Sequence, residues 1–225
     1  MIKGILFDFD GTLSYRAASA YQMYRYLLSL LFPELADDSL VLEARVQRCM
    51  LWDEYGTIDK RHVLQMIREK WKPDMDIAYY RDLWYHKFCA FQVIMPGAYT
   101  VLEKLKAKYK IGMISNGDGL TQRLKIDRLK LASYFDVIYL SGDFGVHKPD
   151  VRIYQAAAEE LHLSCSEIAF IGDTFDTDIL GAMRAGMLPL WYCYEHRGIT
   201  DQPVRILRDF QDIAALFLEN TDWNR

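Results

Sequence analysis

Outside residues 12–96, the chain alternates between short apolar runs and longer segments whose apolar residues recur at helical spacing. Short apolar runs that end in polar loops are typical of buried parallel strands, whereas helical spacing is typical of amphipathic helices. This pattern predicts strands over residues 2–7, 110–114, 137–140, 168–171 and 188–191. It predicts helices over residues 101–109, 120–131, 153–161, 179–185 and 213–218. Such alternation favours right-handed crossovers and an α/β fold with a doubly wound parallel sheet.

The segment between Thr12 and Pro96 differs, because no strand-like run precedes a polar loop there. Four apolar faces at helical spacing are marked by Met23, Tyr24, Leu27, Leu28 and Leu31, by Leu42, Val46, Cys49 and Met50, by Val63, Leu64, Ile67 and Trp71, and by Tyr80, Leu83, Trp84, Phe88 and Phe91. Pro33 and Pro73 would end the first and third helices. We therefore predict a helical domain of residues 14–95, inserted into an α/β core of residues 1–13 and 96–225.

Polar residues follow four of the predicted strands at the point where each strand ends. Asp8 and Asp10 follow the first strand, and Ser115 follows the second. Lys148 lies in the loop after the third strand, and Asp173 follows the fourth. Because the carboxyl ends of parallel strands meet at one edge of a sheet, we expect these side chains to converge on a ligand crevice. Taken singly, each motif also fits an ordinary turn, a helix cap or a solvated loop lysine.

The carboxylates of Asp8 and Asp10 lie two residues apart at the end of a buried strand. Two like charges about 4 Å apart repel each other by roughly 4 kcal/mol at an effective dielectric constant near 20. A cation or a proton is usually needed to offset this repulsion. The placement therefore predicts a metal site or an acid–base site.

In this order, the motifs Asp8 to Thr12, Ser115, Lys148 and Asp173 to Asp178 resemble those of the haloacid dehalogenase (HAD) superfamily of hydrolases, most of which are phosphatases. The resemblance extends over nearly the whole chain. It implies a Rossmann-like HAD core with an inserted α-helical cap domain. In this superfamily, such a cap closes over the active site and helps to select the substrate.

The resemblance implies catalytic roles for three residues. Asp8 would be the nucleophile and would form an aspartyl-phosphate that water hydrolyses, which divides one difficult displacement into two easier ones. Asp10 would act as the general acid and then as the general base. Lys148 would supply a fixed positive charge that reaches both the phosphoryl oxygens and Asp8.

Phosphate monoesters carry about two negative charges near neutral pH, so a carboxylate nucleophile needs cations to approach phosphorus. The resemblance implies Mg²⁺, held by Asp8, the backbone carbonyl of Asp10, and Asp173. Asp178 would either bind the metal directly or orient a metal-bound water. The same motifs imply phosphate-binding roles for Gly11, Thr12, Ser115, Asn116 and Gly117.

We therefore predict an enzyme, a Mg²⁺-dependent phosphatase that hydrolyses a small-molecule phosphomonoester through an aspartyl-phosphate. HAD dehalogenases lack the carboxylate two residues after the nucleophile, so Asp10 favours phosphoryl chemistry over carbon–halogen cleavage. A phosphosugar mutase-type phosphotransferase keeps the same acidic pair and is the alternative. A non-catalytic ligand-binding relative is a second alternative. The motifs do not choose among nucleotide, sugar and glycolate phosphates as the substrate.

The composition of the chain limits the classes of binding partner and indicates a cellular compartment. The 225 residues are 51% hydrophobic, enough for a sizeable core, and the formal net charge of -4 provides no basic surface for nucleic acid. No apolar run approaches the roughly 20 residues of a membrane span, and no signal peptide is recognised, so we expect a cytoplasmic protein without a membrane partner. The four cysteines form no CxxC pair, and we expect free thiols. The sequence leaves both a monomer and a homodimer open.

Overall fold

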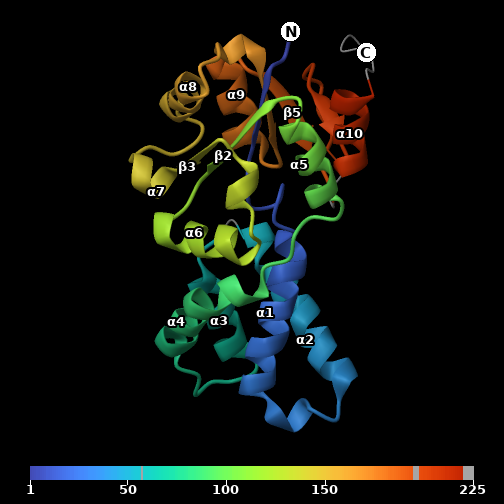
Figure 1. Ribbon diagram of the computed structural model, residues 1–225. Coiled ribbons are helices and arrows are strands. Elements are labelled where there is room, and N and C mark those ends of the chain that lie inside the picture. Colours follow the sequence, from blue (N-terminus) through green and yellow to red (C-terminus); the bar gives the residue numbers. More distant parts are fainter. Residues whose placement is uncertain (57, 195–197, 220–225) are drawn as a thin grey trace. The chain divides into compact units, whose positions relative to one another are not determined.

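The computed structural model describes residues 1–56, 58–194 and 198–219. The chain divides into two compact units (Figure 1). Met1–Ser14 and Ile94–Arg225 form the first, the α/β unit, and Tyr15–Val93 forms the second, the helical unit. None of the helices in the described ranges has the length and apolar character needed to cross a lipid bilayer.

The α/β unit is built on a six-stranded sheet with the order β3-β2-β1-β4-β5-β6, in which all neighbouring strands are parallel. Its strands are β1 (Gly4–Phe7), β2 (Lys110–Ser115), β3 (Val137–Leu140), β4 (Ile168–Gly172), β5 (Leu188–Tyr192) and β6 (Arg205–Leu207). The strand order reverses between β1 and β4, so the predicted doubly wound parallel sheet is confirmed. The sequence predicts the first five strands and misses β6.

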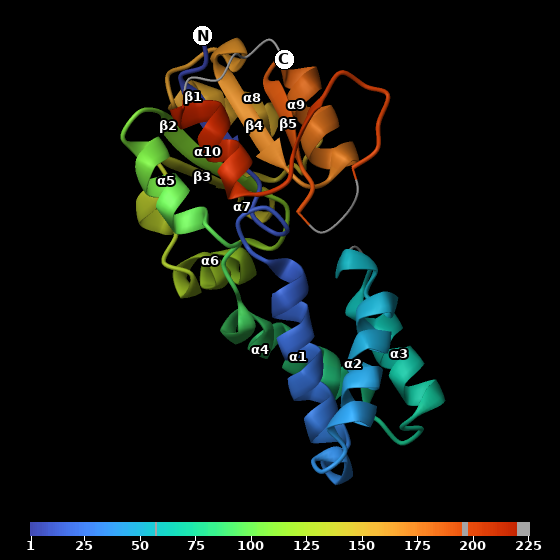
Figure 2. The same ribbon diagram turned by 90° about the vertical axis from the view of Figure 1, so that its right-hand side faces the viewer.

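Helices cover both faces of this sheet (Figures 1 and 2). On one face, α5 (Ala98–Lys106) packs against α10 (Phe210–Leu218). On the other face, α8 (Val151–Glu160) packs against α9 (Leu180–Ala185) and contacts the strands. A buried apolar core, which includes Phe170, fills the space between the second pair of helices and the sheet.

Several helix ends in the α/β unit differ from the prediction. α6 (Gly119–Arg128) follows β2 and ends before the predicted residue 131. The short α7 (Ser141–Phe144) follows β3 and has too few residues to show a helical spacing of apolar positions. The last acidic motif forms a π-helical turn (Phe175–Ile179) that leads into α9, so the helical region begins earlier than predicted. Such turns often occur at functional sites.

The central strand β1 positions the first acidic motif. All four of its residues are buried, and it pairs with β2 on one side and with β4 on the other. The ladder continues one residue beyond the strand, because Asp8 N donates to Ile171 O at 2.8 Å. The chain then turns through Gly11, which has a φ of +94°. Asp8 is therefore presented at the carboxyl end of the sheet, where ligands bind in open α/β folds.

The helical unit contains the four predicted helices, α1 (Arg16–Leu31), α2 (Ser39–Trp52), α3 (Lys60–Lys70) and α4 (Ile77–Lys87). The last three each begin after an aspartate whose carboxylate accepts a hydrogen bond from a first-turn N–H. The prediction that the fourth helix includes Phe88 and Phe91 is wrong, because the chain tightens there into a 3-10 turn, Phe88–Phe91. Three residues per turn place these two rings on one side, where Phe88 stacks on Trp84 with ring centroids 5.2 Å apart.

A buried ion cluster lies inside the helical unit. Asp53, which is 1% exposed, accepts hydrogen bonds from the Tyr24 hydroxyl at 2.6 Å and from Lys60 Nζ. Arg16 Nη2 lies 3.0 Å from the other Asp53 oxygen. Because desolvated cations are stable only with well-placed anionic partners, this one carboxylate stabilises the buried ammonium of Lys60 and the partly buried guanidinium of Arg16.

The chain leaves the α/β unit and returns to it at adjacent positions. Ser14 and Ile94 pair as an isolated antiparallel bridge. On the side of the helical unit, Tyr15 N donates to Val93 O at 2.7 Å. The junction therefore lies close to the predicted boundaries of the insertion, and the functional assignment of the two units as catalytic core and cap stays a prediction.

Candidate active site

Four residues that the sequence singles out lie together beyond the ends of β1 and β4. Lys148, from the loop between α7 and α8, places its Nζ 2.5 Å from Asp8 Oδ1 and 2.7 Å from Asp178 Oδ1. One carboxylate oxygen from each of Asp8, Asp173 and Asp178 lies within 4.8 Å of the other two. Lys148, Asp8 and Asp178 are 4%, 6% and 1% exposed, so these three residues of the acidic cluster are almost closed to bulk water, whereas its fourth member, Asp173, is partly exposed.

With all of its groups ionised, the acidic cluster would hold more negative than positive charge, because three carboxylates share one ammonium. Burial raises the pKa of Asp8 from 3.8 to about 7; Lys148 opposes this rise, and Asp178 adds to it. Burial and the charges of Asp8 and Asp178 raise the pKa of Asp173 well above its ordinary value. Burial acts to lower the pKa of Lys148, but the charges of Asp178 and Asp8 outweigh it, so the pKa is raised and the side chain stays an ammonium.

A further cation would balance the acidic cluster, and the donor atoms suit one. Asp8 Oδ2 is buried and has no hydrogen-bond partner within the described part of the chain. Each oxygen of Asp178 already has a donor, Lys148 Nζ for one and the Thr174 N–H, at 3.0 Å, for the other. Carboxylate oxygens are the ligands that Mg²⁺ prefers. The geometry fits a divalent cation on Asp8 and Asp173, and it favours an orienting role for Asp178.

The loop after β1 approaches Asp173 closely because of a glycine. Gly11 has a φ of +94°, and a Cβ built there would lie 2.2 Å from Asp173 Oδ2. A side chain at this position would displace either the turn or the carboxylate. The next residue, Thr12, is fully buried, and its hydroxyl oxygen has no hydrogen-bond partner among the described residues. Its phosphate-binding role stays a prediction.

Asp10 is held by residues that the sequence motifs do not identify. Lys125 Nζ lies 3.0 Å and 2.9 Å from the two carboxylate oxygens of Asp10. Gln122 Nε2 donates to Asp10 Oδ2 at 2.9 Å. Both partners come from α6. The only signal for them in the sequence is a polar pair three residues apart on a predicted helix, which is equally typical of a solvated face.

The tripeptide after β2 is tied into the neighbouring loops. Asn116 Oδ1 accepts from Lys148 N at 2.8 Å, and Asn116 Nδ2 donates to Lys148 O at 3.1 Å, so this side chain fixes the backbone that carries the lysine. The Gly117 amide, for which we predict a contact with phosphate, donates to Ser141 Oγ at 3.0 Å in this structure. Ser115 is 1% exposed. The phosphate-binding roles predicted for Ser115, Asn116 and Gly117 stay predictions.

A protein-family model described as haloacid dehalogenase-like hydrolase matches residues 2–186. The chain belongs to this family. The resemblance found in the sequence is thus confirmed, and the protein is an enzyme of the hydrolase class. Its six-stranded parallel sheet is the Rossmann-like core expected of a HAD-like hydrolase.

Known proteins similar to this HAD-like hydrolase include two relatives and one solved structure. The pyrimidine 5′-nucleotidase YjjG of Escherichia coli (strain K12) is 36% identical over 104 residues, an alignment that covers 46% of each protein. The glyceraldehyde 3-phosphate phosphatase of Pyrococcus abyssi is 30% identical over 210 residues, which cover 86% of this chain and 82% of that protein. The magnesium-bound crystal structure of the HAD-hydrolase YfnB from Bacillus subtilis superposes with a TM-score of 0.72 at 20% identity, covering 96% of this chain and 99% of that one. This last likeness supports the fold.

Proposed function

We propose that this HAD-like hydrolase is a Mg²⁺-dependent phosphatase that hydrolyses a small-molecule phosphomonoester. The observation that carries the proposal is the acidic cluster, in which Lys148 bridges Asp8 and Asp178 while Asp173 lies beside them. An excess of buried negative charge is unfavourable in isolation and becomes useful when a metal cation and a phosphoryl group bind there together.

The relatives support the same substrate class. Two of them are named for action on a nucleotide and on glyceraldehyde 3-phosphate, and both compounds are small phosphate esters. The related YfnB structure contains magnesium, in agreement with the all-oxygen donor set of this chain. Because the two substrates differ beyond the phosphate, the choice of leaving group is left to experiment.

In the proposed first step, a carboxylate oxygen of Asp8 attacks phosphorus. The bond between Asp8 and phosphorus forms, the bond from phosphorus to the leaving group breaks, and the proton of the Asp10 carboxyl group moves to the departing alkoxide. Lys148, an ammonium paired with Asp8, offsets the negative charge that develops on the phosphoryl oxygens. The product of this step is an aspartyl-phosphate.

In the second step, Asp10 acts as a base. It takes a proton from a water molecule whose oxygen attacks phosphorus. The bond between phosphorus and Asp8 breaks, inorganic phosphate leaves, and the free carboxylate of Asp8 is restored. Each residue thus returns to its starting state after one turnover.

The metal would be held by Asp8, Asp173 and the backbone carbonyl of Asp10. When bound, Mg²⁺ supplies positive charge that offsets the repulsion between the substrate phosphate and the carboxylates. Asp178 orients Lys148 through their 2.7 Å contact. Gly11 gives Asp173 the space that its position requires.

The test is phosphate release from a panel of phosphorylated sugars, nucleotides and small phosphorylated acids, with Mg²⁺ and with a chelator. We expect release that requires the metal and is lost in Asp8→Asn. Asp127→Asn, which changes an exposed carboxylate of α6, is the matched control and should keep full activity. Release that survives chelation, or that Asp8→Asn retains, would overturn the proposal.

A further inference from the structure

Two side chains of α6 hold the carboxyl group of Asp10 through hydrogen bonds. Lys125 Nζ contacts both Asp10 oxygens, at 3.0 Å and 2.9 Å, and Gln122 Nε2 contacts Oδ2 at 2.9 Å. A carboxylate with one donor can swing about its side-chain bonds, whereas donors on two side chains restrict both its position and the tilt of its plane.

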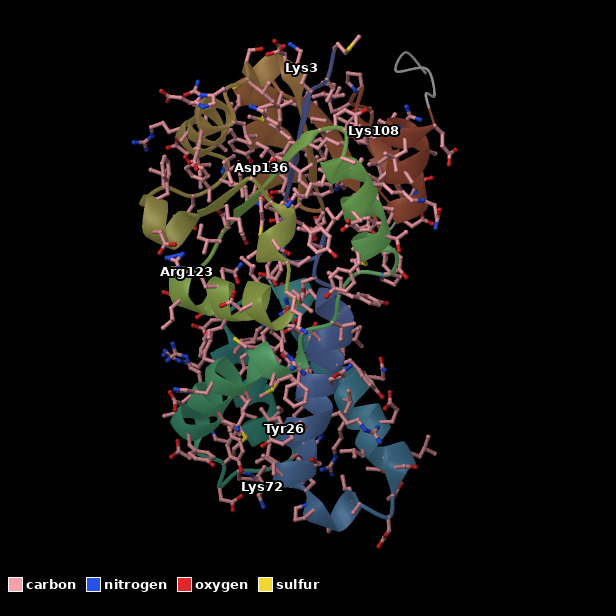
Figure 3. All side chains as sticks on the ribbon, in the orientation of Figure 1. Lys3, Tyr26, Lys72, Lys108, Arg123 and Asp136 are labelled. Carbon is pink, nitrogen blue, oxygen red and sulfur yellow. The ribbon has the colours of Figure 1, made fainter. Side chains whose placement is uncertain are left out.

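The two partners occupy the inner face of α6. Gln122 and Lys125 are three residues apart, so they lie on the same side of the helix. They are 2% and 7% exposed, whereas Leu124 is 50% exposed and the side chain of Arg123, labelled in Figure 3, is 57% exposed. A buried ammonium is costly without an anionic partner, and Asp10 supplies one at 2.9 Å. The burial of Lys125 is therefore compensated at the acid that we propose for catalysis.

Gln122 also connects Asp10 to the end of β2. Gln122 Nε2 lies 2.6 Å from Ser115 Oγ and 3.1 Å from Asn116 O. Lys125 Nζ lies 5.9 Å from the ring centroid of Phe9, the residue between the two aspartates of the first motif. Gln122 and Lys125 thus connect the Asp10 carboxyl group both to the end of β2 and to the loop that follows β1.

We propose that Gln122 and Lys125 are positioning residues that hold the Asp10 carboxyl group where it exchanges a proton with the leaving group. This inference rests on the proposed phosphatase function and on the acid role of Asp10 within it. A displacement of about 1 Å at a reacting group reduces a rate by on the order of 100-fold. The competing explanation is that Lys125 and Gln122 only stabilise the fold.

Two substrates with different leaving groups separate these explanations. An alkyl phosphate needs a proton on its departing oxygen, whereas p-nitrophenyl phosphate needs little protonation. We expect Lys125→Met to lower kcat/KM for the alkyl phosphate by about 10- to 100-fold and that for p-nitrophenyl phosphate by less than about threefold. Gln122→Met, which keeps nearly the same volume without the donor, should show the same selectivity and serves if Lys125→Met does not fold.

Two further variants complete the test. Arg123→Met, on the outer face of α6, should leave both kcat/KM values unchanged. In an Asp10→Asn background, Lys125→Met should cause no further selective loss, because residues that act through one group are not additive. The positioning role would be overturned if Lys125→Met lowered kcat/KM equally for the two substrates. It would also be overturned if Lys125→Met kept its full selective loss in the Asp10→Asn background. The phosphatase proposal would stand in both cases. A wild-type enzyme that hydrolyses neither compound with Mg²⁺ would overturn the proposed function itself.

Discussion

Asp8→Asn should stabilise the metal-free protein while abolishing turnover. Burial raises the pKa of Asp8 from 3.8 to about 7 despite its ion pair with Lys148, so the folded state binds this proton more tightly than the unfolded state does. The stability contributed by this group is therefore present below about pH 4 and is lost as the pH rises through about 7. A shift of about three pKa units corresponds to about 4 kcal/mol. An amide avoids this penalty, and we expect a gain of about 2–4 kcal/mol near pH 8 and almost none near pH 4.

The assay is urea unfolding in the presence of a chelator, near pH 8 and near pH 4, for the wild type and Asp8→Asn. Asp127→Asn is the control for loss of an exposed carboxylate, and it should change neither value by more than about 0.5 kcal/mol. Excess Mg²⁺ should reduce the difference near pH 8, because a metal at 100 times its Kd stabilises the wild type by about 2.7 kcal/mol and the variant lacks one carboxylate ligand. A variant that is less stable near pH 8 without metal, or a difference that does not change with pH, would refute the reasoning.

Three other substitutions test separate parts of the structure. Asp53→Asn should lower the free energy of unfolding by about 3–5 kcal/mol, because it leaves the buried Lys60 and the partly buried Arg16 without their carboxylate; a loss below about 1 kcal/mol in urea unfolding would contradict this. Asp10→Asn should lower kcat/KM by about 10²–10⁴ for alkyl phosphates and much less for p-nitrophenyl phosphate, and equal losses would count against its role as the acid. Gly11→Ala should weaken Mg²⁺ binding in titration calorimetry, because its Cβ would lie 2.2 Å from Asp173 Oδ2. The control Gly145→Ala, at a φ of +87° with open space around its Cβ, should not change the affinity. Similar affinities for the two variants would argue against this steric role of Gly11.

The sheet could be predicted because five of its strands are apolar runs that end in polar loops. The sixth, β6, could not, since only one of its three residues is fully buried and its first residue is the charged and exposed Arg205. The 3-10 turn at Phe88–Phe91 was missed for a different reason. Aromatic residues spaced by three and four positions fit an α-helix and a tightened turn equally well, and packing against Trp84 decides between them.

The acidic cluster could be anticipated because parallel topology brings the ends of strands together, whatever their separation in the sequence. Gln122 and Lys125 could not, because a lysine on a helix is normally solvated and helical spacing does not reveal which polar face is buried. The hydrogen-bond acceptor of the Gly117 amide could not be predicted from the sequence either. It is the hydroxyl group of Ser141, which lies in a helix of only four residues.

The bridge between Ser14 and Ile94 makes the helical unit an exchangeable module. Backbones that pair in an antiparallel bridge bring their Cα atoms to roughly 5 Å from each other, a gap that a tight turn can close. The strands of the sheet could therefore be connected without the intervening chain. Insertions of very different lengths can be accommodated at this position without changing the order of the strands. A change in the length or sequence of the helical unit therefore leaves the order and register of the strands that carry the acidic cluster unchanged.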